Sequence, residues 1–344
     1  MIRVLVAEDS ATARQVIIDV IRAESGMEVA GVATDGAEAV ACARALLPDI
    51  VTMDTQMPIL DGYEATRQIM RDAPVPILIV SGVANPEDSA AGLNALRAGA
   101  LGIVAKPSAA ADPDGIASRQ RLVSQLRALA DVKVVRRMDI GAHRVTPVAA
   151  PTSRPPLAIV GIAASSGGPA ALAQIVAALP ADLPVPIVIV QHNAHGFMPA
   201  LAKWLNGAGA LPVVVATDGE DLQPGVLYIA PDEYHFGVSA GVRCELEASP
   251  PLEGFRPSAT FLFNSIARSF GSRSLSVILT GMGADGVVGL AAVRAAGGQT
   301  IAQSERSSLV WGMPGAAVAA GVVDSVLDLD AVAAAISAAA FAWR

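Results

Sequence analysis

The sequence is poor in cysteine, in aromatic residues and in positive charge. Cys42 and Cys244 are its two cysteines, and they stand so far apart that neither a disulfide framework nor a paired-cysteine metal site is expected. Lys and Arg number 24 against 32 Asp and Glu, a net charge of −8, which argues against broad nucleic-acid binding because neutralising phosphates requires surplus positive charge. We therefore expect a protein of a reducing compartment with no nucleic-acid partner.

A secretion signal and a membrane span are also missing from the pattern. The apolar run at residues 2–7 meets the acids Glu8 and Asp9 at once, without the basic start, longer apolar stretch and cleavage site of a signal peptide. No uninterrupted apolar run approaches the roughly 18 residues that a membrane-spanning helix needs. The expectation is a cytoplasmic protein that does not insert into a membrane.

What the chain does have is length and apolar content. Its 344 residues are 53% hydrophobic and 16% charged, which predicts about two globular domains. Short β-rich runs alternate with Ala-rich helical runs from the start, and the runs are apolar throughout, as in strands buried on both faces. This predicts a doubly wound, five-stranded parallel sheet in residues 1–130, with strands at 2–7, 28–33, 50–53, 75–80 and 101–105 and helices at 12–24, 36–47, 62–71, 87–97 and 116–130.

A basic and then proline-rich stretch interrupts this alternation at residues 131–156 and is interpreted as an interdomain linker. Alternation resumes in residues 157–344, which predicts a second α/β domain, Rossmann-like with a mainly parallel sheet. Its expected strands are 157–162, 185–191, 211–216, 226–230, 242–247 and 275–280, and its expected helices are 169–179, 198–205, 259–270, 286–296 and 331–340.

Polar side chains follow several strands of the first predicted sheet. Glu8 and Asp9 end the first strand, Asp54 the third, Ser81 the fourth and Lys106 the fifth. Ligand sites of open parallel sheets lie at this carboxyl edge. Three carboxylates in one cleft repel one another and favour a bound Mg²⁺. Asp54 is then a candidate phosphoryl acceptor, with Lys106 and Ser81 placed to contact the phosphoryl oxygens.

These residues resemble the receiver domain of response regulators over about residues 1–130. The resemblance rests on Val6-Ala7-Glu8-Asp9-Ser10, Asp54-Thr55-Gln56-Met57-Pro58, Asp61-Gly62, Ser81 and Lys106-Pro107. It implies phosphorylation of Asp54 by a histidine kinase. It also implies Mg²⁺ held by Glu8, Asp9, Asp54 and the backbone carbonyl of Gln56, and a cis bond before Pro107. Ile103 stands where many receivers have Tyr or Phe, and Gln56 where Glu is frequent.

The second domain has its own polar residues at strand ends. Ser165 lies in a Ser/Gly turn between a strand and a helix opened by Pro169, where free backbone N–H groups could stabilise an oxyanion. His192 follows the next strand, and Asp285 follows an apolar strand later in the chain. The three form a candidate triad in which Asp285 orients His192 and His192 deprotonates Ser165.

Two other interpretations of these residues stay open. His192, His195 and His235 could belong to a zinc site, although no metal-binding spacing accompanies them. The glycines of residues 281–286 satisfy the dinucleotide pattern G-x-G-x-x-G, with Glu305 as a ribose-binding acid, which would make the protein a nicotinamide oxidoreductase. Against this, Asp285 would place a negative charge inside a pyrophosphate loop.

Further motifs resemble the catalytic domain of the CheB family, the chemotaxis protein-glutamate methylesterases. They are Gly161-x-x-x-Ser165-Ser166-Gly167-Gly168, Gln191-His192, Gly196-Phe197, Ile229-Ala230-Pro231, Arg256-Pro257-Ser258, Leu279 to Gly286, Ala302-Gln303 and Gly312-Met313-Pro314. The resemblance implies Ser165 as nucleophile, His192 as base and Asp285 as its partner. Backbone N–H groups near Ser166 and Met282 are the oxyanion donors it suggests. Ala194 and Thr260 depart from the family's usual Pro and Asp.

The resemblance to CheB implies hydrolysis of glutamyl methyl esters on chemoreceptor helices, with release of methanol, and deamidation of receptor glutamines. It implies a CheA-type histidine kinase as phosphodonor, recruitment to chemoreceptor arrays, and no cofactor for the ester hydrolysis itself. Our hypothesis is that the unphosphorylated receiver covers the esterase cleft, so that deleting residues 1–150 raises basal activity. The non-enzyme alternative is a phosphorylation-dependent interaction protein that does not use the triad.

Overall fold

A computed structural model describes residues 1–82, 90–110, 112–130, 132, 134, 155–192 and 197–342. The chain divides into two units, Met1–Met138 and Asp139–Arg344. Most of the expected linker, residues 131–156, lies outside the described ranges, so the domain boundaries at 130 and 157 stay predictions. No helix within the described ranges is long and apolar enough to cross a membrane.

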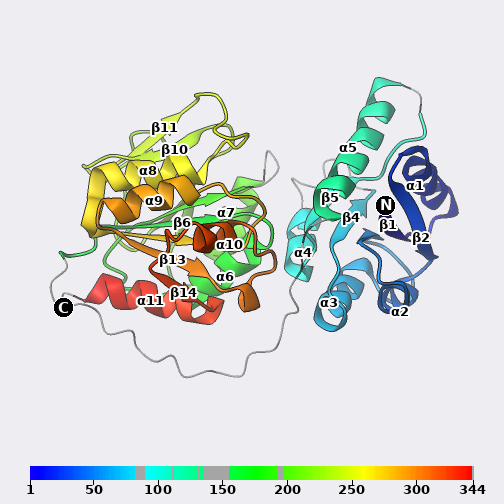
Figure 1. Ribbon diagram of the computed structural model, residues 1–344, viewed down its shortest axis with the longest axis horizontal. Coiled ribbons are helices and arrows are strands. Elements are labelled where there is room, and N and C mark those ends of the chain that lie inside the picture. Colours follow the sequence, from blue (N-terminus) through cyan, green and yellow to red (C-terminus); the bar gives the residue numbers. More distant parts are fainter. Residues whose placement is uncertain are drawn as a thin grey trace. The chain divides into compact units, whose positions relative to one another are not determined.

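The first unit is a five-stranded parallel sheet, as predicted, and its strand order is β2-β1-β3-β4-β5 (Figure 1). The strand order reverses between the neighbours β1 and β3, which is where ligand sites of such sheets form. Helix α1 contacts α5, and α3 contacts both α2 and α4. The elements are β1 (Ile2–Ala7), α1 (Ala11–Ala23), β2 (Met27–Ala33), α2 (Gly36–Leu46), β3 (Ile50–Asp54), α3 (Gly62–Asp72), β4 (Ile77–Ser81), α4 (Ala90–Ala98), β5 (Gly102–Ala105) and α5 (Pro113–Ala130).

Local chemistry explains where these elements begin. The Ser10 hydroxyl accepts a hydrogen bond from the Ala13 N–H at 3.4 Å and caps α1. Strand β4 begins after Pro76, which has no N–H to donate to a neighbouring strand. Helix α5 begins three residues before the expected start because Pro113 fits the first turn and Asp112 accepts from the Gly115 N–H at 2.7 Å.

The second unit is a seven-stranded parallel sheet in the order β14-β13-β12-β6-β7-β9-β8, with a separate antiparallel pair of β10 and β11. The structure adds β10, β13, β14 and α10 to the elements that we expected from the sequence. The strands are β6 (Ile159–Ala164), β7 (Ile187–Gln191), β8 (Val213–Val215), β9 (Leu227–Ile229), β10 (His235–Val238), β11 (Cys244–Glu247), β12 (Ser274–Ile278), β13 (Gln299–Gln303) and β14 (Ser325–Leu327). The helices are α6 (Gly168–Ala178), α7 (Met198–Asn206), α8 (Ala259–Phe270), α9 (Val287–Ala295), α10 (Met313–Ala319) and α11 (Leu329–Phe341).

Helices cover both faces of this second sheet. Helices α8 and α9 pack together on one face, and α6 and α11 on the other (Figure 1). The contact of α8 with β6 is so close that a Cβ at Gly161 would lie 2.4 Å from Ile266 Cδ1. The strand order reverses between β6 and β12. The loops after these two strands carry Ser165 and Asp285, so the candidate triad lies at the reversal.

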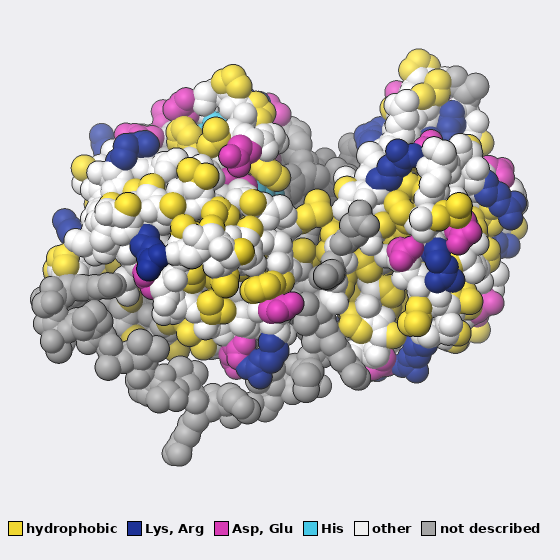
Figure 2. Space-filling view, in the orientation of Figure 1, with side chains coloured by type: hydrophobic (Ala, Val, Ile, Leu, Met, Phe, Trp, Pro, Cys, Tyr) yellow, Lys and Arg dark blue, Asp and Glu magenta, His cyan; other side chains and the backbone are white. Residues whose placement is uncertain are grey.

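Both cysteines are free thiols. Cys244 is buried in the core of the second unit, and burial raises its pKa to about 12, so it is protonated and unreactive at neutral pH. On the face drawn in Figure 2, basic and acidic side chains are interspersed on each unit, and neither sign dominates that face.

Candidate active site and acidic site

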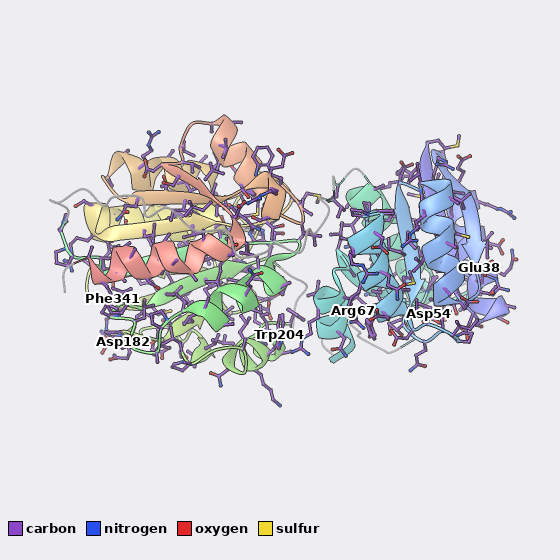
Figure 3. All side chains as sticks on the ribbon, turned by 90° about the horizontal axis from the view of Figure 1, so that it is seen from below. Glu38, Asp54, Arg67, Asp182, Trp204 and Phe341 are labelled. Carbon is purple, nitrogen blue, oxygen red and sulfur yellow. The ribbon has the colours of Figure 1, made fainter. Side chains whose placement is uncertain are left out.

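The acidic site lies at the strand reversal of the first sheet. Glu8 and Asp9 follow β1, and Asp54, labelled in Figure 3, ends the neighbouring β3. One ligand atom from each of these three carboxylates lies within 4.8 Å of the others, which no other trio of His, Cys, Asp or Glu achieves in the described ranges. The three carboxylates that we predicted as metal ligands from the sequence therefore lie close together in the structure.

Lys106 joins this cluster from β5. Its Nζ donates to Glu8 Oε1 at 2.8 Å and to Asp54 Oδ2 at 2.9 Å. Burial pulls the pKa of Lys106 down, but the hydrogen bonds to both carboxylates outweigh it and the net shift is upward. Ser81 ends β4 and is buried, and its backbone carbonyl accepts from the Lys106 N–H at 2.8 Å. The Lys106 ammonium thus contacts the candidate phosphoryl acceptor, and Ser81 ends the strand next to that of Asp54.

The donor set fits a hard divalent cation. Glu8 is fully buried, and its Oε2 has no hydrogen-bond partner, so one carboxylate oxygen is left for a further ligand. Burial raises the pKa of Glu8, and the nearby charge of Asp54 adds to this, whereas the hydrogen bond from Lys106 opposes it. A cation between these carboxylates would remove that repulsion. Gln56, the fourth expected ligand, is exposed in the loop after β3.

One expectation for this unit is wrong. The described residues contain one cis peptide bond, Arg256–Pro257, and the expected cis bond before Pro107 is not found. Lys106 reaches both carboxylates without it. Ile103 is 9% exposed within β5. It is therefore a core side chain, not an aromatic ring that could turn between buried and exposed positions.

The candidate nucleophile is held by a tight turn after β6. The Ser165 N–H donates to the Thr280 carbonyl at 3.0 Å, and the Ser165 carbonyl accepts from the Gly168 N–H at 2.8 Å. Gly167 has φ +78°, which favours glycine at this point of the turn. Gly281 must also lack a side chain, since a Cβ there would lie 2.7 Å from Ser165 Cβ. The Ser/Gly pattern thus serves to bring the loop after β12 against the serine.

His192 and Asp285 are in direct contact. His192 Nε2 lies 2.9 Å from Asp285 Oδ2, and Asp285 is 2% exposed. The carboxylate accepts three further hydrogen bonds from the start of α8: from Ser258 Oγ at 2.9 Å, Ala259 N at 2.7 Å and Thr260 N at 2.9 Å. Burial raises the pKa of Asp285, but the bonds from His192 and Thr260 dominate and lower it to about 2. Asp285 is therefore ionised at neutral pH.

The imidazole of His192 is fixed from one side by Phe255. The two rings stack with centroids 4.3 Å apart and planes 14° from parallel. Phe255 and Leu252 exchange backbone hydrogen bonds of 3.0 Å across a two-residue turn, in which Glu253 and Gly254 have φ +52° and +89°. The sequence analysis missed Phe255, although the Glu-Gly pair after an apolar residue is a recognisable turn signal.

Ser165 and His192 do not share a hydrogen bond, although both lie in the described ranges. Because Nε2 faces Asp285, Nδ1 is the ring nitrogen left to act as a base, and it is buried without a partner. Such bonds often tighten only when substrate is bound. Neither the Ser166 nor the Met282 N–H is a donor in the hydrogen bonds of the described residues. Their role as oxyanion donors therefore stays a prediction.

The zinc interpretation does not fit His235. Its Nδ1 accepts from the Ser258 N–H at 3.3 Å, and its Nε2 donates to the Pro250 carbonyl at 3.1 Å, so both ring nitrogens are occupied. The ring also stacks on Phe261, with centroids 4.8 Å apart. His235 thus supports the loop that carries Ser258. His195 lies outside the described residues.

The loop of residues 281–286 is likewise committed to the triad. Asp285 turns toward His192, and the Gly286 N–H donates to Thr260 Oγ1 at 2.8 Å instead of being free for a pyrophosphate. This explains the departure at Thr260, whose hydroxyl anchors the loop of the acid. Ala194, the other departure in this unit, lies outside the described residues.

A hydroxyl that the sequence analysis missed links the strand ends. Thr280 is buried, and its Oγ1 donates to the Ser166 carbonyl at 2.9 Å and accepts from the Val310 N–H at 2.9 Å. Gln303 Oε1 accepts from the Thr280 N–H at 2.8 Å. The nucleophile turn is therefore tied to β12 and β13 through polar groups that no motif announces.

The fold and these geometries define a two-part α/β protein, with a receiver-type acidic site in one unit and a Ser–His–Asp arrangement of the serine-hydrolase type in the other. Comparison with family models agrees: the CheB methylesterase model matches residues 160–336, and the response regulator receiver domain model matches residues 4–113. The chain belongs to the CheB methylesterase family and carries a response regulator receiver domain.

Similar proteins extend over the whole chain. A protein-glutamate methylesterase/protein-glutamine glutaminase 4 of Myxococcus xanthus is 48% identical, over 98% of this chain and 97% of its own length. The corresponding protein of the group 3 operon of Rhizobium meliloti is 42% identical over 99% and 97%. The crystal structure of the Thermotoga maritima CheB methylesterase catalytic domain has a TM-score of 0.51 and 37% identity, covering 52% of this chain and 97% of that domain.

Proposed function

We propose that this chain is a phosphorylation-activated hydrolase that removes methyl esters from glutamyl side chains of chemoreceptors, releases methanol, and deamidates receptor glutamines by the same chemistry. The observation that carries the proposal is the 2.9 Å contact of His192 with a buried, ionised Asp285, beside a serine turn, in a chain whose family is defined by this domain. The names of the similar proteins specify the same two activities.

In the first step, Ser165 Oγ attacks the ester carbonyl carbon while His192 Nδ1 takes the hydroxyl proton. The proton on Nε2 stays in its bond to Asp285, whose negative charge stabilises the imidazolium. The backbone N–H groups of Ser166 and Met282 donate to the oxyanion of the tetrahedral intermediate. His192 then returns its proton to the leaving oxygen, methanol departs, and the glutamyl group is left esterified to Ser165.

In the second step, water attacks the acyl group on Ser165, and His192 again takes and returns a proton. The products are the free glutamate side chain and the regenerated serine. With a glutamine substrate, the first step releases ammonia instead of methanol. Phe255 covers one face of the imidazole throughout, which limits the access of water to the base.

The acidic site supplies the control. Asp54 accepts a phosphoryl group from a CheA-type histidine kinase, and Lys106 moves from the carboxylate to pair with the new phosphoryl oxygens. Glu8, Asp9, Asp54 and the Gln56 carbonyl would hold Mg²⁺, which neutralises charge on the entering phosphoryl group. We propose that the protein acts in the cytoplasm, at chemoreceptor arrays, where kinase and methylated receptor helices are both present.

The test is methanol release from methylated chemoreceptor membranes, with and without acetyl phosphate and Mg²⁺. We expect release that rises with the phosphodonor, and no release by Ser165→Ala under either condition. A chemosensory response that is the same in cells with the wild type and in cells with Ser165→Ala would instead indicate an interaction protein that does not use the triad. Absence of release by the wild type would reject the proposed substrate.

A further inference from the structure

The side chain of Gln191 lies between the candidate nucleophile and the candidate base. Gln191 ends β7 and is 1% exposed. Its Nε2 donates to the Ser165 carbonyl at 2.9 Å and to the His192 carbonyl at 2.8 Å. A single amide group therefore joins the backbones of two triad members, which belong to turns after different strands.

The orientation of this amide follows from its neighbours. Two carbonyl oxygens accept hydrogen bonds and cannot donate them, so the NH₂ group must face them, and both of its hydrogens are used. The oxygen then faces the other way, where Gln191 Oε1 is buried without a partner. A Cβ at Gly168 would lie 2.0 Å from that oxygen, so the glycine is required for the glutamine to fit.

An unsatisfied buried acceptor is unfavourable, and a carbon side chain of the same shape would avoid it. What the glutamine contributes in return is the bridge between the two carbonyls. We propose that Gln191 is a positioning residue for the hydrolysis: it sets the separation and the relative orientation of Ser165 and His192. The inference rests on the proposed function, since it assigns Gln191 a part in that reaction.

Thr300 provides a comparison away from the triad. It lies in β13 of the same sheet and is fully buried. Its Oγ1 donates to Asp324 Oδ2 at 3.1 Å and accepts from the Asp324 N–H at 3.0 Å. These bonds reach neither the nucleophile turn nor His192. Replacing Gln191 or Thr300 removes a buried polar group, but only Gln191 bridges the backbones of two triad members.

The experiment compares Gln191→Met with Thr300→Val in the full chain. Methionine keeps the length and approximate volume of glutamine and removes its donors. For Gln191→Met we expect kcat to fall by about 10²-fold with KM unchanged, because misplaced groups slow the chemical step but not substrate binding. The rate at which a fluorophosphonate probe labels Ser165 should fall by a similar factor, at a temperature where circular dichroism shows the variant folded. Thr300→Val should also lose thermal stability and should keep most of its labelling rate.

Wild-type labelling by a folded Gln191→Met variant would overturn the inference, whatever its melting temperature. If that variant does not fold, Gln191→Asn carries the test. It keeps the donors but withdraws them by one methylene, so we expect kcat and labelling below wild type, and wild-type rates would again overturn the inference. Failure of the proposed function is distinct, because the wild type itself would then release no methanol.

Discussion

The two units place their functional residues in the same way and finish them differently. In each, a parallel sheet reverses its strand order, and the polar residues follow the two strands at the reversal. In the first unit, Glu8 keeps a buried oxygen without a partner beside two other carboxylates. In the second, Asp285 accepts four hydrogen bonds. The acidic site thus leaves one buried carboxylate oxygen open to a further ligand, whereas the Asp285 carboxylate already accepts bonds from His192 and the start of α8.

The pKa shifts of the two buried acids show this difference. Burial is the largest cause for both and raises the pKa of each. For Glu8, the hydrogen bond from Lys106 lowers the pKa by less than burial raises it, and the repulsion from Asp54 raises the pKa further. For Asp285, the bonds from His192 and the start of α8 bring the value to about 2. Asp285 accepts more hydrogen bonds than Glu8 does, and the pKa values of the two acids shift in opposite directions.

The variant with the largest expected effect should abolish the activity of the second unit and leave that of the first unit unchanged. Ser165→Ala removes the nucleophile, and we expect kcat for methanol release to fall by about 10⁶-fold, as when the serine of a preset triad is lost. Phosphorylation of Asp54 should be unchanged, because the acidic site shares no residue with the triad. Methanol release and incorporation of labelled phosphate, measured on one preparation, check both halves. A parallel loss of phosphorylation would contradict the separation.

Asp285→Asn tests the site of the second unit, in which His192 is held by the Asp285 carboxylate. An amide cannot stabilise the imidazolium and would present a donor where only an acceptor fits, so we expect kcat to fall by about 10³–10⁴-fold.

The same variant tests the pH dependence of stability. The pKa of Asp285 is about 2 in the folded chain against an ordinary value of 3.8. Its stabilisation is therefore complete above about pH 4 and is lost as the pH falls toward 2, by about 2 kcal/mol in total. Urea unfolding at pH 5, 4, 3 and 2 measures this. The wild type should lose about that much more than Asp285→Asn, and parallel curves for the two would contradict the assignment.

Asp54→Asn tests the acidic site of the first unit and should have a smaller effect on methanol release. Basal methanol release should be unchanged, while the increase with acetyl phosphate and Mg²⁺ disappears. Couplings between sites are typically 1–3 kcal/mol, so we expect to lose an activation of about 5- to 150-fold. Activation that persists in Asp54→Asn would place the phosphoryl acceptor elsewhere.

Thr260→Val should have the smallest effect, and Thr300→Val is its control. Each hydroxyl accepts a backbone N–H, from Gly286 at 2.8 Å and from Asp324 at 3.0 Å respectively. Thr260→Val leaves the Gly286 N–H unpaired and should cost about 1–3 kcal/mol of unfolding free energy. Thr300→Val should cost less, because the Asp324 N–H keeps its bond to the Thr300 carbonyl at 3.0 Å. Only Thr260→Val loosens the loop of Asp285, so only this variant should also lower kcat. We expect a fall of about tenfold, which corresponds to about 1.4 kcal/mol of activation free energy. Equal kcat in the two variants would contradict the anchoring role.

Much of this architecture is visible in the sequence. Apolar runs bounded by polar residues predicted both parallel sheets. The sequence also placed Ser165, His192 and Asp285 after strands, and the structure brings His192 and Asp285 into direct contact. Strand β13 was not predicted because its sequence, Gln-Thr-Ile-Ala-Gln, is polar at both ends. Strand β14 was not predicted because it has only three residues. Helix α10 begins with Met-Pro-Gly, which resembles a turn.

Other features could not be found without the fold. Phe255 stacks on His192 across 63 positions of the chain. Gln191 is adjacent to the base in sequence, but its second carbonyl partner belongs to Ser165, on another strand. Such contacts depend on strand register and not on local pattern. The roles of Ser166 and Met282 as oxyanion donors stay predictions, as do the domain boundaries and the occlusion of the cleft.

The pairing of β6 with β12 also bears on how the enzyme assembles. Residue Ile159 aligns with Ser274, so the two central strands meet only after more than a hundred intervening residues have been synthesised and ordered. Closing so long a loop is entropically costly and slow. Until it closes, the serine and its acid are on unconnected pieces of chain. We therefore expect molecules in which β6 and β12 have not paired to lack esterase activity, so that the recovery of this activity during refolding reports the pairing of these strands.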